Sequence, residues 1–316
     1  MDDIKTAIII LNYNGIEDTI ECFDSIKASK SQSFQIIIVD NASTDDSMDR
    51  LEAHLEKQKT NYHIVSENAA YCNDSVVIIK SRLNRGFSGG NNLGLAFALN
   101  NPAINYFWVL NNDTSIDESA LDELIVYKEQ QPQIGIIGSK LMFYHEPKKI
   151  QAIGGVFNKY KARFSQIGCD QIDTGQYDNF YPKMDFVIGA SLFVDRFYLE
   201  KVGLLAEDYF LYFEEIDWAL RGKKEGISVG FCSKSIVYHK QGATTKNDVK
   251  GEKNIDAMYF RFKNTLVFYR KFYPLLLPVA CITVLFRMMK FAFRNANYWS
   301  LLFPVFFQKH RYYFEG

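Results

Sequence analysis

Three acidic side chains are crowded into one short segment of the sequence. Residues 208–226, DYFLYFEEIDWALRGKKEG, carry Glu214, Glu215 and Asp217 among aromatic residues, at the predicted start of a helix. An acidic first turn is common because the helix dipole favours negative charge there. Partial burial and like-charged neighbours, however, raise the pKa of a carboxyl group toward the range of a general base. The segment is therefore typical either of an ordinary helix start or of acid–base chemistry.

Polar residues also follow three stretches that read as buried strands. These polar ends are NYNG, VDNASTDDS and NNDT, which include Asp40, Asn111 and Asp113. Ligands of open α/β sheets bind beyond the carboxyl ends of the strands. Asp40 could accept hydrogen bonds from a base or ribose, whereas Asp113, helped by Asn111, could ligate Mg²⁺ or Mn²⁺ beside a phosphate. One such end is ordinary turn chemistry, but three together favour a ligand site.

A glycine-rich turn and a histidine complete the candidates. NRGFSGGNNLG, at 84–94, lacks the G-x-G-x-x-G spacing, so it is a weak dinucleotide signal. Its glycines at a helix start still allow close approach of an anion, although a turn needed only for packing is the alternative. His239 ends a predicted strand, where a neutral ring nitrogen could ligate a metal, although a lone histidine is more often structural.

The elements that must position these residues alternate between strand and helix. Buried strands are predicted over 6–14, 34–43, 75–81 and 105–111, and helices over 17–29, 44–58 and about 90–100. This order is typical of a mostly parallel, doubly wound α/β sheet flanked by helices. Further on, strands are predicted over 134–144, 149–159, 184–196 and 227–239, with a helix over 213–224 and a mostly helical pattern from 254.

The bulk composition excludes some classes of protein. A net charge of -1 argues against a general nucleic-acid binder. Five widely separated cysteines show neither zinc-site spacing nor a disulfide framework. The acidic start MDDIKTAIIIL lacks a secretory signal, so we expect a cytoplasmic protein.

These landmarks together resemble the family 2 glycosyltransferases, which are inverting, nucleotide-sugar-dependent enzymes of the GT-A (Rossmann-like) fold. The resemblance is closest to a bacterial rhamnosyltransferase-like branch and covers residues 4 to about 245. The matching segments are IIILNYNG, IIIVDNASTDDS, NRGFSGGNNLG, FWVLNNDT, GASLFVDR, FLYFEEIDWALR and VYHKQG.

The resemblance implies a role for each matching residue. It implies donor binding by Leu11, Tyr13, Asp40, Asn84, Asn91, Asn112 and Asp113. It implies a Mg²⁺ or Mn²⁺ site at Asp113, His239 and Asn111, and acceptor binding at Gly189, Ala190 and Ser191. The acidic group Glu214, Glu215 and Asp217 would supply the catalytic carboxylates, with Glu215 as the base. Two departures stand out: Asn111 replaces the first carboxylate of the D-x-D metal motif, and Glu215 stands where Asp is more usual.

The implied activity is transfer of a sugar, from dTDP-rhamnose or a UDP-sugar, to a hydroxyl of a glycan acceptor in cell-surface polysaccharide biosynthesis. The alternative is a weak or inactive saccharide-binding or scaffold subunit of an assembly complex. A nucleotidyltransferase is disfavoured, because LNYNGIEDT after the first strand lacks a glycine-rich loop with Arg and Lys.

The sequence divides into a catalytic domain, 1–245, and a helical extension, 246–316. Within the first we expect a nucleotide-sugar half to about 115 and an acceptor half over 116–245. In the extension basic residues outnumber acidic ones by twelve to four, and FYPLLLPVACITVLF holds an apolar run of about 14 residues, short of the roughly 20 needed to span a bilayer. With Arg287, Lys290 and Arg294 following, it favours a helix docked on the inner face of the cell membrane, near a lipid-linked acceptor. A helical cap or an oligomer contact is the alternative.

Overall fold

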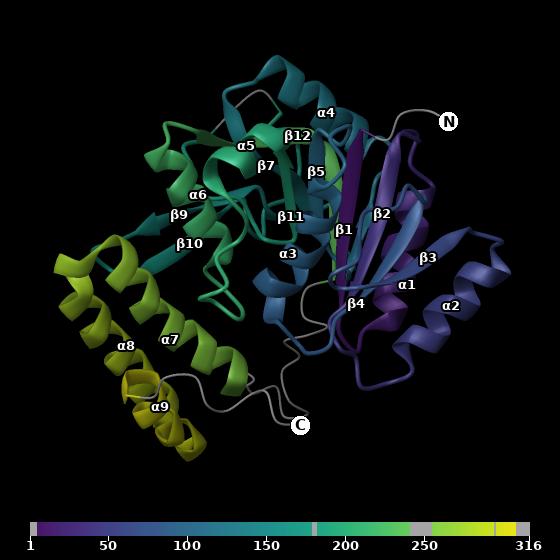
Figure 1. Cartoon of the computed structure of the whole chain (residues 1–316). Coiled ribbons are helices and arrows are strands. Elements are labelled where there is room, and N and C mark those ends of the chain that lie inside the picture. The colour runs from purple at the N-terminus through teal and green to yellow at the C-terminus, as the bar shows by residue number, and fades with distance from the viewer. Residues whose placement is uncertain (1–4, 179–181, 241–254, 294, 308–316) are drawn as a thin grey trace.

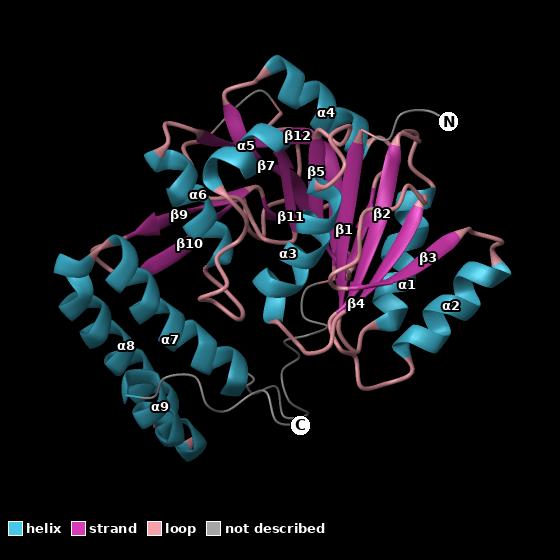
Figure 2. Cartoon of the chain, in the orientation of Figure 1, coloured by secondary structure: helices cyan, strands magenta, loops and turns pink. Residues whose placement is uncertain are grey.

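A large mixed β-sheet forms the centre of the molecule (Figures 1 and 2). The computed structural model describes residues 5–178, 182–240, 255–293 and 295–307. The sheet has ten strands, nine of them in the order β3-β4-β2-β1-β5-β11-β7-β12-β6, with β8 paired to β7. The strands are β1 (Thr6–Asn12), β2 (Phe34–Asp40), β3 (Tyr62–Ser66), β4 (Val76–Lys80), β5 (Tyr106–Asn111), β6 (Thr114–Ile116), β7 (Ile134–Phe143), β8 (Ile150–Ala152), β11 (Ser191–Asp195) and β12 (Ser228–His239).

The predicted parallel half of the sheet is confirmed. Strands β3, β4, β2, β1 and β5 are all parallel neighbours. Every residue of β2 is buried, as expected for a continuous apolar strand covered on both faces. Next to β5, β11 runs antiparallel and pairs with β7, to which β12 is parallel. The carboxyl ends of β1, β2, β5, β7 and β12 therefore meet at one edge.

Helices cover both faces of the sheet. One face packs against α1 (Ile16–Lys27), α2 (Ser47–Lys57) and α4 (Ala120–Gln130), and the other packs against α3 (Gly86–Leu99), α5 (Arg196–Val202) and α6 (Glu214–Lys224). Each face has its own apolar core, centred on fully buried Phe23 and Trp108 on the first face and on Phe107 and Trp218 on the second.

Several predicted elements differ from those in the structure. Strand β3 and helix α4 were not predicted, because β3 is short and largely half-buried and α4 lacks a clear apolar stripe. The predicted strand over 184–196 reduces to β11, since the chain before it forms loops. The strand predicted over 149–159 divides into β8 and β9 (Gly154–Asn158), and β9 pairs with β10 (Arg163–Ile167) in a separate two-stranded sheet.

The C-terminal extension is helical, as predicted, and is joined to the central core. It contains α7 (Ile255–Phe272), the short helices η1 (Pro274–Leu276) and η2 (Ala296–Leu301), α8 (Leu277–Ala292) and α9 (Leu302–Phe307). Phe262, Leu266 and Phe268 of α7 are buried in the same core as α3 and α6. The predicted boundary at 245/246, the predicted helix start at 254 and Arg294 lie outside the described residues.

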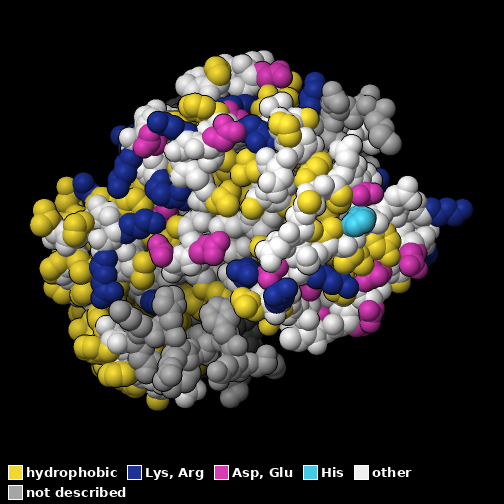
Figure 3. Space-filling view, viewed as in Figure 1, with side chains coloured by type: hydrophobic (Ala, Val, Ile, Leu, Met, Phe, Trp, Pro, Cys, Tyr) yellow, Lys and Arg dark blue, Asp and Glu magenta, His cyan; other side chains and the backbone are white. Residues whose placement is uncertain are grey.

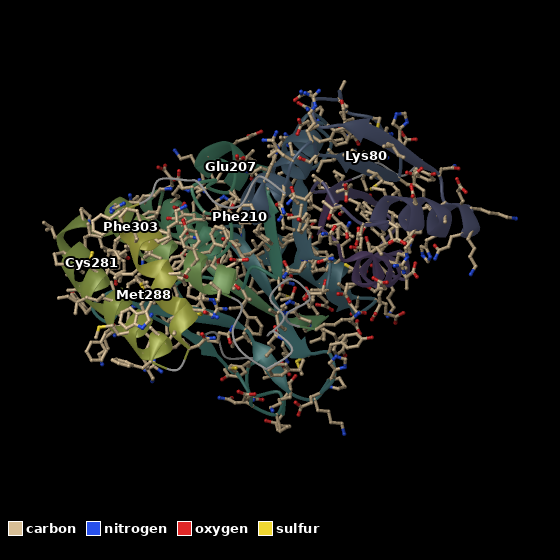
Figure 4. The ribbon with its side chains drawn as sticks, turned by 90° about the horizontal axis from the view of Figure 1, so that it is seen from below. Lys80, Glu207, Phe210, Cys281, Met288 and Phe303 are labelled. Carbon is tan, nitrogen blue, oxygen red and sulfur yellow. The ribbon has the colours of Figure 1, made fainter. Side chains whose placement is uncertain are left out.

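The helix that contains the predicted apolar run is longer than the run itself. Residues Pro274–Ala292 form one helical stretch of 19 residues that is long and apolar enough, by length and composition, to cross a membrane. It reaches this length because the helix continues past Arg287 through Met288 and Met289. Figure 4 shows the extension, marked by Cys281, Met288 and Phe303, separated by Glu207 and Phe210 from the part of the sheet that carries Lys80.

Candidate active site

The carboxyl ends of β1 and β2 and the start of α1 are joined by a buried polar network. Asn12 Nδ2 donates to Asp40 Oδ1 at 3.2 Å, and the Thr19 hydroxyl donates to Asn12 Oδ1 at 2.8 Å. Asn112, just after β5, donates to Thr19 Oγ1 at 3.1 Å. The structure therefore connects two of the predicted donor residues, Asp40 and Asn112, through Asn12 and Thr19. Tyr13 lies beside this network, about one-third exposed (36%).

The glycine-rich turn packs directly against the ends of β1 and β2. The Asn41 side chain donates to Asn84 Oδ1 at 2.9 Å and accepts from the backbone N–H of Arg85 at 2.9 Å. A Cβ placed on Gly90 would lie 2.3 Å from Leu11 Cδ1, so a larger residue there would displace the Leu11 side chain. The predicted residues Leu11 and Asn84 are thus brought together. Asn91, also predicted, is fully buried and donates to Phe87 O within its own helix.

The three predicted metal ligands gather at the ends of β5 and β12. His239 Nε2 lies 3.1 Å from Asp113 Oδ1 and 3.5 Å from Asn111 Nδ2. The backbone fixes the arrangement, since Lys240 N–H donates to Asp113 O at 3.0 Å and His239 pairs with Thr114 across β12 and β6. In the described part of the chain, no cluster of three or more His, Cys, Asp or Glu side chains could hold a metal alone. Two strong ligands and an amide fit a cation that is also held by substrate phosphates and water.

Gln151 of β8 orients the histidine for such a role. Its Oε1 lies 2.6 Å from His239 Nδ1, and its Nε2 donates to the His239 carbonyl at 3.3 Å. The second contact fixes which end of the amide faces the ring. Nδ1 is therefore the ring nitrogen that donates to Gln151, and Nε2 is directed at Asp113. A histidine that ligates a metal is usually held by a partner of this kind.

Glu214 and Glu215 are the first two residues of α6, and their carboxyl groups are largely shielded from solvent. Glu214 is buried and Glu215 half-buried, and the Oε2 atom of each is shut off from solvent without a hydrogen-bond partner among the described residues. Burial raises the pKa of Glu215 to about 7, although nearby backbone N–H groups and the Arg261 guanidinium partly offset it. Burial and the neighbouring Glu215 raise the pKa of Glu214 well above its usual range. Glu215 is therefore the carboxylate suited to accept a proton near neutral pH.

Asp217, the third predicted catalytic carboxylate, has a different environment. It is fully buried and lies 2.7 Å from Arg221 Nε and 2.6 Å from Lys271 Nζ. Tyr209 also donates to it, at 3.1 Å. The two cations and the hydroxyl compensate the negative charge of its carboxylate. Because Lys271 lies in α7, Asp217 anchors α6 to the extension.

Two backbone hydrogen bonds tie the segments that carry the metal candidates and the candidate catalytic carboxylates to neighbouring loops. Asn111 N–H donates to Ala190 O at 3.1 Å, and a Cβ on the adjacent Gly189 would lie 4.0 Å from the Phe87 ring. Phe87 N–H in turn donates to Phe210 O at 2.8 Å, in the loop that leads into α6. Of the predicted acceptor residues, Gly189 is half-buried and lies near the Phe87 ring.

The other two predicted acceptor residues, Ala190 and Ser191, are buried. Ser191 accepts a hydrogen bond from Trp108 Nε1 at 2.9 Å and lies 2.8 Å from the Ser139 hydroxyl. Its hydroxyl is thus engaged inside the sheet, which leaves Gly189 as the position through which this loop could face an acceptor.

A cavity of about 490 Å³ lies elsewhere, at the amino ends of β7 and β12. It is lined by Tyr127, Lys183, Lys223 and Phe231, among others, and by none of the predicted site residues. Ligands of such sheets bind at the carboxyl ends of the strands. The candidate site described above lies at the opposite edge of the sheet.

The sequence alone missed Asn12, Thr19 and Gln151. Asn12 ends β1 directly and could have been found by the strand-end rule that singled out Asp40. Gln151 could not, because it lies in a three-residue strand, 88 residues from the histidine it orients.

The arrangement of strands and helices is that of a GT-A-like fold, and the family follows from the sequence. The chain belongs to glycosyl transferase family 2, whose family model matches residues 7–203. The low-salt glycan biosynthesis hexosyltransferase Agl10 of Haloferax volcanii is 27% identical over 246 residues, which cover 76% of this chain and 68% of Agl10.

Solved structures share the fold at low sequence identity. GalNAc-T7, solved with UDP, GalNAc and Mn²⁺, matches with a TM-score of 0.59 at 10% identity over 75% of this chain, which spans only 44% of that longer chain. The mannosyltransferase PcManGT of Pyrobaculum calidifontis, solved with GDP-Man and Mn²⁺, matches with a TM-score of 0.53 at 13% identity, covering 96% of this chain and 80% of that one. These matches confirm the predicted GT-A fold.

Proposed function

We propose that this protein is an inverting glycosyltransferase that moves a sugar from a nucleotide-sugar donor to a hydroxyl of a glycan acceptor. The observation that carries the proposal is the secluded carboxyl group of Glu215, whose Oε2 has no hydrogen-bond partner among the described residues. The loop that leads into Glu215 is hydrogen-bonded through Phe210 O to Phe87 N–H in the glycine-rich turn. A base in this position serves a single displacement. PcManGT was solved with GDP-Man, and GalNAc-T7 with UDP and GalNAc, which supports a nucleotide-sugar donor here.

The residues divide the reaction between them. Glu215 accepts the proton of the acceptor hydroxyl, whose oxygen bonds to the anomeric carbon as the bond from that carbon to the diphosphate breaks and leaves its electron pair on the diphosphate. The network of Asp40, Asn12 and Asn112 holds the nucleoside end, and Leu11 packs beneath it. Mg²⁺ or Mn²⁺, when bound at Asp113 and His239 with Asn111 beside them, supplies positive charge to the leaving diphosphate.

We further assign the donor to dTDP-rhamnose or a UDP-sugar and the acceptor to a lipid-linked glycan of cell-surface polysaccharide biosynthesis. The extension supports a lipid-linked acceptor. One face of α8, formed by Ala280, Val284, Met288 and Ala292, packs inward, whereas its other face is exposed and apolar. The exposed side chains on this outer face and on the neighbouring segments are Leu275, Ile282, Leu285, Phe286, Phe293, Trp299, Phe303 and Phe307.

A lipid surface is the occupant that this outer face fits. Figure 3 shows apolar side chains covering the extension, with Lys and Arg side chains along its border with the rest of the molecule. Exposed apolar side chains, bordered by this rim of Lys and Arg side chains, match the apolar layer and the charged headgroup layer of an anionic membrane surface. The buried side of α8 is packed against the rest of the protein, so lipid could surround only its exposed side. We therefore favour docking on the cytoplasmic surface of the cell membrane over spanning it.

A donor panel tests the proposed activity. The full chain is mixed with dTDP-rhamnose, UDP-sugars or GDP-mannose, with Mn²⁺, Mg²⁺ or a chelator, and the thermal shift and the release of nucleoside diphosphate are measured. We expect one donor to give both signals in a metal-dependent way, with release lost in Glu215→Gln. A donor that stabilises the protein without any release or transfer would instead favour the saccharide-binding scaffold. The anomeric configuration of the product decides whether transfer inverts.

A further inference from the structure

The turn that leads into Glu214 and Glu215 is not stabilised by its own sequence. Tyr212 and Phe213 both have left-handed backbone conformations, with φ of 71° and 81°, which are unfavourable for large aromatic residues. Phe213 is also the N-cap of α6 and offers no side-chain hydrogen bond to the helix. The start of α6 therefore needs support from another part of the chain.

Helix α7 of the extension gives that support. Asn264 is fully buried, and its Nδ2 donates to two successive carbonyls, Leu211 O at 2.8 Å and Tyr212 O at 3.1 Å. One turn earlier, the Arg261 guanidinium lies 4.5 Å from the centre of the Tyr212 ring. A single face of α7 thus holds the turn by its backbone and by its aromatic side chain.

Aromatic side chains of α7 also contact the first and last residues of the turn. Phe260 stacks on Phe210, with ring centres 4.9 Å apart, and Phe268 contacts the Phe213 ring at 5.3 Å. Each of the four residues from 210 to 213 is therefore contacted by α7.

The opposite side of the turn is held by the donor-binding half. Phe87 N–H donates to Phe210 O, and a Cβ on Gly86 would lie 2.3 Å from the same oxygen. The turn is thus confined between the glycine-rich turn and α7. A movement of α7 would therefore displace the turn before Glu215 relative to the glycine-rich turn.

We propose that Asn264 is a positioning residue for Glu215, so that α7 of the extension is part of the active site. Asn264 ties the backbone before α6 to α7, and Arg261, on the same helix face, adds a positive charge near the base. The inference rests on the proposed function, because it assigns Asn264 a role through Glu215. Its backbone part, the clamp itself, is independent of any activity.

Asn264→Ala tests the clamp, and Thr265→Val is the matched control. Thr265 is the next residue, is buried, and donates only to Arg261 O within α7, so its variant loses a hydrogen bond that does not reach the turn. Amide hydrogen exchange of residues 208–217 is measured in the full chain, together with turnover, donor KM and the pH profile. Should Asn264→Ala not fold, Asn264→Ser, whose hydroxyl can donate only one hydrogen bond, replaces it.

We expect faster exchange over 208–217 in Asn264→Ala alone, with turnover about 10²-fold lower, as a misplacement of roughly 1 Å can cause. Donor KM should be unchanged, and the acidic limb of the pH profile should move. Wild-type exchange in Asn264→Ala overturns the clamp, and faster exchange with wild-type turnover and pH profile overturns its catalytic role. If the wild-type protein transfers no sugar, the proposed function fails, whereas the exchange result still decides the clamp.

Discussion

Glu215 and Asp217 are two positions apart on the first turn of α6, yet the structure gives them opposite environments. Arg221 and Lys271 neutralise Asp217, whereas burial without a hydrogen-bond partner for Oε2 among the described residues raises the pKa of Glu215 to about 7. Neighbouring carboxyl groups in different environments can serve different roles. The assignment of the base therefore depends on surroundings that the sequence pattern EEID does not reveal.

Glu215→Gln should lower turnover by about 10²–10⁴-fold, because general base catalysis typically contributes that much. Donor binding should be retained, since the amide keeps the shape of the side chain. In the wild type, turnover should rise with pH through about 7 as Glu215 loses its proton, and the variant should lose this rise. Steady-state kinetics between pH 5 and 9 measure both effects. Near-normal turnover in the variant would remove Glu215 from the role.

The same substitution should stabilise the protein at high pH. The folded-state pKa of Glu215 is raised from 4.5 to about 7, so between these values the folded state binds more protons than the unfolded state. The free energy of unfolding therefore falls as pH rises through this window. Glu215→Gln removes the penalty, on the order of 1–3 kcal/mol at pH 8. Denaturant unfolding at pH 5 and pH 8 should show the two proteins alike at pH 5 and the variant more stable at pH 8. Equal stability at both values would contradict the raised pKa.

At the scale of elements, the parallel half of the sheet, apart from β3, and its polar edge were predictable from sequence. Buried β-branched runs ending in polar residues predict both the strands and the edge where Asp40 and Asp113 lie, because parallel strands share a carboxyl edge. The pairing of β11 between β5 and β7 was not predictable, since it joins strands about 50 to 80 residues apart in sequence. Contacts such as Gln151 to His239 and Asn264 to Leu211 were missed for the same reason.

Gln151 of β8 allows a test of the proposed metal site. Gln151→Leu keeps the side-chain volume but leaves His239 Nδ1 without its partner, so the ring is no longer oriented toward Asp113. We expect the affinity for Mn²⁺ to fall about 10–100-fold, as loss of such a partner commonly causes. Electron paramagnetic resonance titration with Mn²⁺ alone measures this without any turnover. Gln133→Leu is the control and should bind Mn²⁺ as the wild type does. Gln133 lies in an exposed turn directly before β7, at the opposite edge of the sheet. Wild-type affinity in Gln151→Leu would argue against a metal role for His239.

At the scale of the whole molecule, the C-terminal extension packs directly against the segment that carries Glu214 and Glu215. Helix α7 contacts the turn before Glu214 with one face and carries α8 on another. The exposed apolar face of α8 is thus only one helix away from the base. A protein docked by this face would hold its active site at a fixed distance from the lipid surface, which suits an acceptor whose reactive end extends from a lipid.

Membrane docking can be tested on the outer face of α8. Phe286 is 75% exposed there, and burying a Phe side chain contributes about 1.5–3 kcal/mol. Phe286→Asp should therefore weaken binding of the full chain to vesicles containing anionic lipid by tenfold or more. Phe197→Asp is the matched control, because Phe197 is 60% exposed on α5, away from the extension, and should leave binding unchanged. Cosedimentation at low and high salt measures both, and salt should weaken the contribution of the basic rim. A wild-type protein that ignores vesicles and forms a dimer that Phe286→Asp separates would show that the face binds a second copy of the chain, contradicting the docking proposal.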